Sequence, residues 1–311
     1  MDRRRGRRSS WALAAALLPV LLLVAGCAGS ESSGSPESTA SDDGQAALGD
    51  PPDPGFGHVH GLGLNPADGA VYAASHYGVW RIPLQGGATG GVTEPVRIAD
   101  RFQDTMGFTV AGPDLFLGSG HPDAREDSPP HLGLILSKDR AETWQPISLR
   151  GEADFHDLAV VGDRVYGYDS TTGTLLVSED TGRTWSERAA FPIRDVTVDP
   201  ADPDRVLATT PDGLMLSRDA GASFRAVGGA PRLLTVDWST GGLAGAEPDG
   251  TVWEAPGADP EAEWERRGRL TGAPQAFTVA QEGELLAADD SGVQISADGG
   301  SNWTLLAAYD G

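Results

Sequence analysis

The chain has 311 residues, a formal net charge of −22 at pH 7 and a single cysteine. An acidic surface of this kind repels phosphate groups, so the composition excludes nucleic acid and anionic lipid headgroups as partners that the folded domain binds directly. A lone cysteine excludes an intramolecular disulfide, and a hydrophobic core must therefore stabilise the fold.

Residues 1–26 have the pattern of a bacterial export signal. Five arginines within the first eight residues precede an apolar run, Trp11 to Val24, that is too short to span a bilayer comfortably. Ala25, Gly26 and Cys27 follow, and the segment resembles a lipobox. We therefore expect cleavage before Cys27, acylation of its thiol, and a protein anchored through this lipid to the outer face of the cell membrane, outside the cytoplasm. The alternative is an ordinary cleavage site beside a free cysteine.

Residues 27–57 are predicted to be a disordered tether between the lipid and the folded domain. Ser, Gly, Pro and acidic residues dominate this segment, and large apolar residues are almost absent from it. Such a composition cannot bury enough apolar surface to fold. The folded domain is then expected over residues 58–311.

From residue 58 onward, short apolar runs alternate with turns, and no segment has a convincing helical pattern. The runs are short and bounded by Gly, Pro, Asp and Asn, which is typical of β-strands. Three such strands can be assigned in each of six successive units. These units lie near residues 58–100, 101–150, 151–190, 191–230, 231–270 and 271–311.

A short pattern, Ser-x-Asp-x-Gly-x-Thr-Trp, recurs with some decay in the domain. Its serines are Ser137, Ser178, Ser217 and Ser296, so the intervals are 41, 39 and 79 residues. A period of about 40 residues is typical of the four-stranded blade of a β-propeller, and the last interval then covers two blades. The sequence therefore predicts an all-β fold, a six-bladed β-propeller. A seventh blade completed by tether residues is the alternative.

The aspartates of the pattern are expected to be structural. A hydroxyl and a carboxylate two positions apart can satisfy the backbone groups of a turn, and the glycine permits a positive φ. We expect each turn to lead from the third to the fourth strand of a blade. The aspartates in question are Asp139, Asp180, Asp219 and Asp298.

This pattern resembles the Asp-box (BNR repeat) of sialidases, sortilin-type receptors and related β-propellers. The phrases HVHGLGLNP (58–66), DTMGFTV (104–110) and DFHDLAV (154–160) also resemble a group of bacterial Asp-box lipoproteins commonly labelled glycosyl hydrolases. The resemblance extends over the whole mature domain. It implies a propeller fold, boxes remote from the ligand-binding face, and either glycosidase activity or a role as a docking platform for protein partners.

Ligands of propellers usually bind at one mouth of the central channel. Alignment of the inner strands on their apolar residues places one side chain from each unit at this mouth. The candidate ligand-binding residues are His60, Met106, His156, Arg194, Arg232 and Gln275.

Five of the six histidines fall at strand ends in the first three units, where they could bind a metal ion. Imidazole suits Zn and Cu, and the thioether of Met106 favours Cu(I), so Cu or Zn is the expected cofactor. His131 is assigned to a loop outside this set. The alternative is a polar channel mouth whose histidines bond to carboxylates and water. The candidate metal ligands are His58, His60, His76, His121 and His156.

A glycosidase would need a pair of carboxyl groups instead. The catalytic candidates are Asp104, Asp123 and Asp154, with Asp195 as a fourth, and Arg194 and Arg232 would bind an anionic sugar. The expected partner is therefore a metal ion, a small polar ligand or a glycan. Docking of another protein is the third hypothesis.

Overall fold

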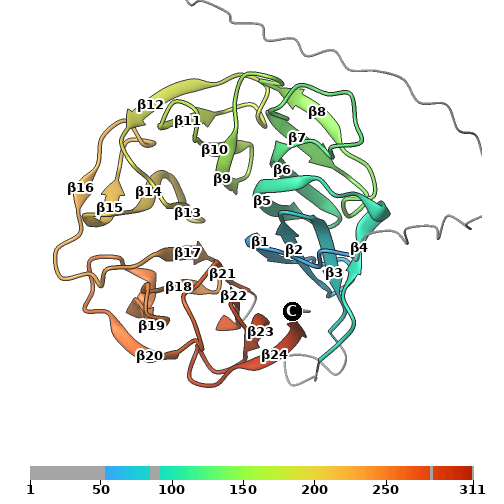
Figure 1. The fold of residues 1–311 in the computed structure, drawn as a ribbon. Coiled ribbons are helices and arrows are strands. Elements are labelled where there is room, and N and C mark those ends of the chain that lie inside the picture. Colours follow the sequence, from blue (N-terminus) through green and yellow to red (C-terminus); the bar gives the residue numbers. More distant parts are fainter. Residues whose placement is uncertain (1–52, 85–91, 281–282, 310–311) are drawn as a thin grey trace, which may run out of the picture. The chain divides into compact units, whose positions relative to one another are not determined.

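The computed structural model describes residues 53–84, 92–280 and 283–309. They form six four-stranded antiparallel sheets, which are arranged as blades around a closed ring (Figure 1). The first strand of each blade lies next to the central axis, and the later strands follow outward. The export signal, Cys27 and nearly all of the tether lie outside the described residues.

Each blade is built from four strands that follow one another along the chain. The strands are, in blade 1, β1 (Val59–Leu64), β2 (Val71–Ser75), β3 (Gly78–Ile82) and β4 (Val96–Arg97); in blade 2, β5 (Asp104–Gly112), β6 (Leu115–His121), β7 (Leu134–Ser137) and β8 (Gln145–Ser148); in blade 3, β9 (Phe155–Val161), β10 (Arg164–Asp169), β11 (Thr174–Ser178) and β12 (Ser186–Ala190); in blade 4, β13 (Asp195–Asp199), β14 (Asp202–Thr210), β15 (Gly213–Ser217) and β16 (Arg225–Ala226); in blade 5, β17 (Thr235–Ser239), β18 (Gly242–Ala246), β19 (Thr251–Glu254) and β20 (Glu265–Arg269); and in blade 6, β21 (Ala276–Val279), β22 (Leu285–Asp289), β23 (Gly292–Ser296) and β24 (Thr304–Ala308). Two short 3-10 turns, η2 (Ile98–Asp100) and η3 (Pro256–Ala258), lie in the connections.

The prediction of a six-bladed propeller is confirmed, and the seven-bladed alternative is wrong. Blades 1 and 6 each consist of four consecutive strands, and the two blades contact each other directly. The Val59 N–H donates to Gln275 Oε1 across this junction (3.1 Å), and the Thr93 N–H donates to the Leu306 carbonyl (2.8 Å). The junction therefore leaves no space for a further sheet.

The hydrophobic core lies between the blades. Each of six clusters of buried side chains joins two neighbouring blades. Between blades 1 and 2, for example, the rings of Tyr72 and Phe116 pack with centroids 4.7 Å apart. Both faces of a sheet are thus covered, so β2 is buried at every position. This packing explains why the strand sequences are short apolar runs and do not strictly alternate between apolar and polar residues.

The Asp-box residues form the turns that lead from the third strand to the fourth. Ser178 Oγ accepts the Gly182 N–H (2.8 Å) and donates to Asp180 Oδ1 (2.8 Å), which also accepts the Thr184 N–H (2.8 Å). These hydrogen bonds, with that of the Thr184 N–H first, lower the pKa of Asp180 to about 2. The serine and aspartate bonds recur at Ser137/Asp139, Ser217/Asp219 and Ser296/Asp298.

Replacement of Ser178 by alanine is expected to lower the free energy of unfolding by about 1–3 kcal/mol, because it leaves a buried Gly182 N–H without its acceptor. Ser186→Ala, on the exposed start of β12, is the control and should change the stability by less than about 0.5 kcal/mol. Urea unfolding of both variants measures the difference. Equal stabilities would contradict the structural role of the box.

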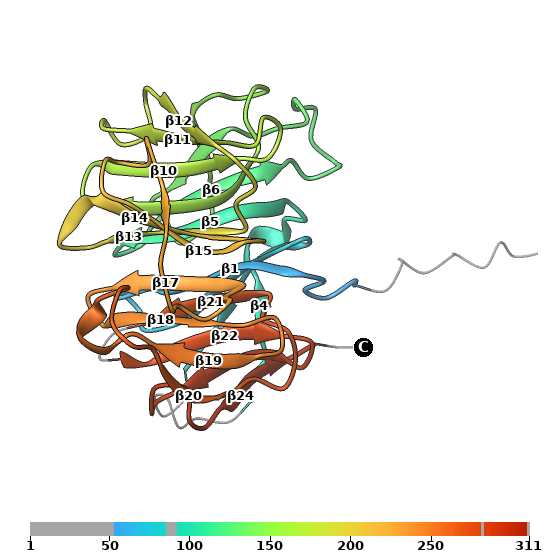
Figure 2. The same cartoon turned by 90° about the vertical axis from the view of Figure 1, so that its left-hand side faces the viewer.

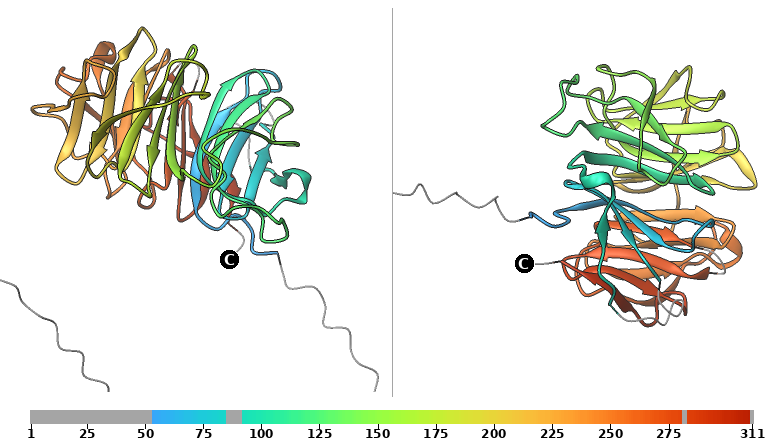
Figure 3. Two further views of the ribbon diagram at one scale, coloured as in Figure 1. Left: turned by 90° about the horizontal axis from the view of Figure 1, so that it is seen from above. Right: turned by 90° about the vertical axis from the view of Figure 1, so that its right-hand side faces the viewer.

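The Asp-box turns and the segment that precedes β1 lie at opposite edges of the blades. The Thr181 N–H of one box donates to the carbonyl of Asp163, in the β9–β10 turn (2.8 Å), so the box lies at the edge where the inner strand ends. Phe56 enters at the other edge, where its ring packs on Trp80 with centroids 4.5 Å apart. Figures 2 and 3 show that the described chain begins and ends on one side of the ring.

Residues 53–57 were assigned to the tether from their composition, yet they contact the propeller. Phe56 is buried, and Asp53 is paired with Arg97. No helix in the described ranges is both long and apolar enough to cross a membrane.

Candidate metal-binding site

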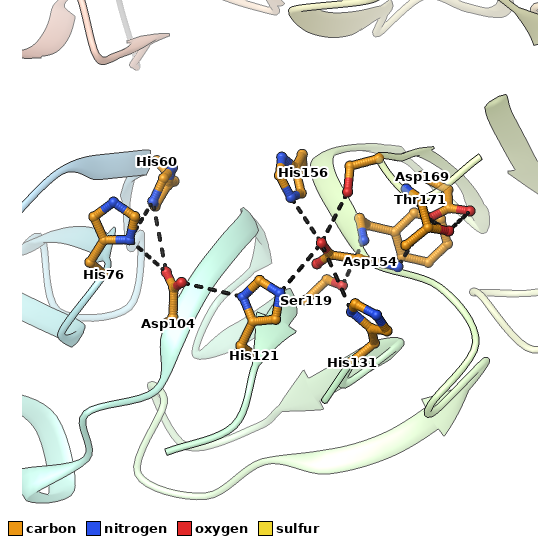
Figure 4. A network of polar contacts seen from close by, with 12 residues as sticks. His60, His76, Asp104, Ser119, His121, His131, Asp154, His156, Asp169 and Thr171 are labelled. Atoms are coloured by element: carbon orange, nitrogen blue, oxygen red, sulfur yellow. Dashed lines mark hydrogen bonds and ion pairs between the residues drawn. The ribbon is translucent and has the colours of Figure 1, made fainter. Parts of the chain in front are cut away.

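All six histidines lie at the mouth where the inner strands begin. His58 and His60 belong to the start of blade 1, and His76 lies in the β2–β3 turn. His121 ends β6, and His131 and His156 lie before β7 and on β9. Figure 4 shows that five of these rings surround two carboxylates, Asp104 and Asp154.

The Asp104 group consists of His60, His76 and Asp104. Asp104 Oδ1 lies 3.1 Å from His76 Nδ1 and 3.8 Å from His60 Nε2. The two ring nitrogens are themselves 3.4 Å apart. Burial, followed by the neighbouring His58, lowers the pKa of His60 to about 3, so this imidazole is neutral at neutral pH. A neutral imidazole is the form that binds a metal ion.

The Asp154 group consists of His121, His131 and Asp154. Asp154 Oδ2 lies 3.5 Å from His121 Nε2 and 4.0 Å from His131 Nδ1, and it also contacts His156 Nε2 (2.9 Å). The Asp154 side chain is only 5% exposed. Burial alone would raise the pKa of Asp154, but the hydrogen bonds from His156 and Ser170 hold it below its usual value.

The backbone of blade 2 brings the two groups together. Asp104 at the start of β5 pairs with His121 at the end of β6, so their side chains share one edge of the sheet. The Leu132 N–H donates to the Gly120 carbonyl (2.8 Å), which returns the long loop to this edge. His131 therefore lies beside His121, with ring centroids 5.6 Å apart.

His131 is the member that the sequence interpretation missed. Its position in a Pro-rich loop concealed it, but it lies three residues before β7. In an antiparallel hairpin the start of one strand lies beside the end of the preceding strand. This rule would have placed His131 opposite His121.

The other predicted metal ligand, His58, lies near the Asp104 group but outside its ligand set. Its ring centroid is 4.8 Å from that of His60 and 5.9 Å from that of His76. His156, also predicted as a ligand, bonds to the same Asp154 oxygen that faces His121 and His131, but it lies outside the ligand set of that group (Figure 4).

A central cavity of about 170 Å³ is lined by His60 of the Asp104 group and by His156, which bonds to Asp154. Of the six side chains that the strand alignment placed at the mouth, five line this cavity and Arg232 does not. Arg232 lies three residues before β17, so it belongs to the approach to the strand rather than to the channel wall. Gln275 lines the cavity but uses its side-chain oxygen to accept from Val59 and Tyr309. The five lining residues are His60, Met106, His156, Arg194 and Gln275.

Of the catalytic candidates, Asp104 and Asp154 lie in the two groups, whereas Asp123 does not. The Asp123 carboxylate is buried and bonds to the Arg125 guanidinium (2.6 Å) and the Phe102 N–H (2.8 Å). These bonds hold the pKa of Asp123 well below its usual value. They give it a structural role in the blade 2 loop.

Three carboxylates on the cavity wall connect neighbouring blades. Asp157 accepts the N–H of Val196 in the next blade, and Asp195 accepts that of Val236 (2.8 Å). In the same way, Asp237 accepts the N–H of Val279 in the following blade (2.7 Å). The sequence predicts Asp195 as a possible catalytic group, but it did not lead us to Asp157 and Asp237. The three aspartates recur at intervals of about one repeat along the inner strands, and this spacing could have identified them as a set.

Asp195→Asn is expected to make folding stability less sensitive to pH. Burial raises the pKa of Asp157 to about 6, and burial together with the Asp157 charge raises that of Asp195 well above its usual value. The folded state thus holds protons that unfolded aspartates release near pH 4, so this stabilisation is complete below that pH and is lost as the pH rises through the raised values. Asparagine does not ionise but can keep the hydrogen bonds.

Urea unfolding between pH 5 and pH 8 measures this effect. The free energy of unfolding of Asp195→Asn relative to the wild type should rise steadily across the range, because only the wild type loses the stabilisation from a protonated Asp195. Asp163→Asn, an exposed control, should show no such trend. A pH-independent difference between Asp195→Asn and the wild type would contradict a buried Asp195 carboxyl group that stays protonated in the folded state.

Neither a protein-family model nor a curated protein matches this sequence. Several solved structures match the fold. A GH74 xyloglucanase from Xanthomonas campestris is 21% identical with a TM-score of 0.51, and the match covers 80% of this chain and 45% of that one. The Niastella koreensis GH74 enzyme is 16% identical with a TM-score of 0.50, covering 81% and 37%. A chain of the nidogen/laminin complex is 15% identical with a TM-score of 0.58, covering 76% and 93%.

These likenesses concern the fold alone, and this chain spans less than half the length of the GH74 enzymes that it matches. Fold and site together define a class: a six-bladed β-propeller with two His/His/Asp groups at one mouth that could hold metal ions.

Proposed function

We propose that this protein is an extracytoplasmic, lipid-anchored β-propeller that binds a transition-metal ion of the Zn²⁺ or Cu²⁺ class at the mouth formed by blades 1 to 3. One observation carries the proposal. In each of the two groups, two imidazole nitrogens and one carboxylate oxygen lie within 4.8 Å of one another.

The donor set favours borderline transition metals over Mg²⁺ and Ca²⁺. Two nitrogens and one oxygen suit Zn²⁺ and Cu²⁺, whereas the alkaline-earth ions prefer oxygen ligands alone. Three protein ligands also leave a coordination position for water or a small ligand. The central cavity, with His60 and Arg194 on its wall, would admit a small polar ligand to that position at the Asp104 group.

The location proposed for the protein rests on its sequence. The arginine-rich leader and the lipobox ending in Cys27 support lipid anchoring outside the cytoplasm, with the membrane as the partner of the lipid. Gly57 enters the propeller beside Tyr77 and His76, so the anchored end of the chain reaches the domain at the face that carries the site.

The geometry favours metal binding over glycosidase chemistry. The two carboxylates that a glycosidase would use, Asp104 and Asp154, each contact at least three imidazoles. The convergence of two imidazole nitrogens and one carboxylate oxygen in each group fits a metal site, in which each group contributes a lone pair. Docking of a protein partner remains a prediction, which rests on the resemblance to propellers that serve as docking platforms for other proteins.

Isothermal titration with Zn²⁺ and with Cu²⁺, in the presence of excess Mg²⁺ to occupy weak carboxylate sites on the acidic surface, tests the proposal. The wild type should bind either ion tightly, and a His60→Ala/His131→Ala double variant, which removes one ligand from each group, should bind at least about 100-fold more weakly. Glu187→Gln, an exposed change on β12, is the control and should bind as the wild type does. Equal binding by all three proteins would overturn the proposal.

A further inference from the structure

The two groups are not separate sites, because His121 lies between them. Its Nδ1 atom is 3.3 Å from Asp104 Oδ2, and its Nε2 atom is 3.5 Å from Asp154 Oδ2 (Figure 4). Each nitrogen of one ring thus faces the carboxylate of a different group. The backbone register places His121, at the end of β6, directly opposite Asp104.

A neutral imidazole cannot satisfy both contacts. It carries one N–H and one lone pair, so one nitrogen can donate to a carboxylate while the other directs its lone pair at an oxygen that also only accepts. A second proton would remove this conflict by making both nitrogens donors, and two metal ions would remove it as well, because each nitrogen would then direct a lone pair at an ion that the carboxylate also binds.

Two further atoms of the Asp154 group lack partners. Asp154 Oδ1 and His131 Nδ1 are buried and have no hydrogen-bond partner among the described residues. A buried polar atom without a partner is costly, and it usually indicates a ligand, ion or water that completes the site. The Asp154 side chain is 5% exposed, whereas Asp104 and His76 in the other group are 27% and 43% exposed.

We propose that the two groups form one two-ion centre in which His121 contributes one nitrogen to each ion. This inference rests on the proposed metal binding and extends it. The first ion binds in the buried Asp154 group with His131, and the second binds in the exposed Asp104 group with His60 and His76. When the second ion binds, the remaining N–H proton of His121 is released to solvent, and the electron pair of that N–H bond becomes the donor to the ion.

Titration of the purified protein with Cu²⁺, followed by electron paramagnetic resonance and by native mass spectrometry, tests the inference. The mass spectra should show two bound ions. The resonance signal should grow to one spin per protein with the first ion and then fall as the second ion binds, because two Cu²⁺ ions joined through one imidazole ring couple antiferromagnetically. His76→Ala and His131→Ala should each bind one ion and keep its full signal.

The outcomes separate this inference from the proposed function. One ion per wild-type protein, or two ions whose signals simply add, would overturn the two-ion centre while metal binding stands. No tight binding of any ion would overturn both. His121→Ala gives a further test that does not depend on the other variants: if it remains folded by circular dichroism and still shows a signal that falls with the second ion, His121 is not the bridge.

Discussion

Asp154→Asn is expected to weaken Zn²⁺ binding at the Asp154 group by roughly 100-fold or more, while the propeller remains folded and the Asp104 group still binds an ion. One oxygen of this carboxylate contacts His121, His131 and His156 and accepts from Ser170 Oγ (3.0 Å). Asparagine has nearly the same volume and keeps a carbonyl acceptor, but it lacks the negative charge that an ion requires. The change therefore removes a ligand with little change in packing.

Thermal unfolding with and without Zn²⁺ measures this effect. A ligand present at 100 times its Kd stabilises the folded protein by about 2.7 kcal/mol, so the wild-type Tm should rise clearly with Zn²⁺, and the Tm of Asp154→Asn should rise less because only the Asp104 group still binds an ion. Asp163→Asn, an exposed change in the β9–β10 turn, should respond as the wild type does. An equal rise in Asp154→Asn would show that the carboxylate is not a ligand.

Gly120→Ala is expected to destabilise the protein by roughly 3 kcal/mol or more and to abolish metal binding. Gly120 has a φ of +128°, and an added Cβ would lie 2.2 Å from the Asp104 carbonyl oxygen and 2.8 Å from the Met106 nitrogen. Both neighbours are backbone atoms, so β5 would have to move away from β6. That movement would separate Asp104 from His121, the residues through which the two groups meet.

Gly228→Ala is the matched control for this change. An added Cβ there meets nothing within 4 Å, so the expected effect on stability is below about 0.5 kcal/mol, with metal binding unchanged. Chemical denaturation gives the stability, and titration with Zn²⁺ gives the binding. A stable Gly120→Ala variant with wild-type affinity would contradict the close approach of the two strands at this point.

The fold could be predicted because its defining signal is local. Ser178, Asp180 and Gly182 make their turn within a few residues of sequence, and the turn recurs in four of the six blades at the same place. The period therefore indicated the size and number of blades without any knowledge of long-range contacts. Blade 5, which lacks the pattern, still has the four strands that the period requires.

The site could be predicted only in part, because its geometry depends on register and loops. Histidines at strand ends pointed to one mouth, and five of the six predicted mouth residues line the cavity. His131 was missed because a long loop returns it to the end of β6 through the Leu132 to Gly120 hydrogen bond. Arg232 was misplaced because β17 begins only at Thr235, so the alignment of this unit used an apolar residue that precedes the strand.

The most direct test of the account is to locate the ions themselves. Crystals of the purified protein grown with Zn²⁺ should show, in anomalous difference maps recorded on the two sides of the zinc absorption edge, one peak among His121, His131 and Asp154 and one among His60, His76 and Asp104. Peaks confined to exposed carboxylates elsewhere on the acidic surface, with the mouth empty, would contradict the account.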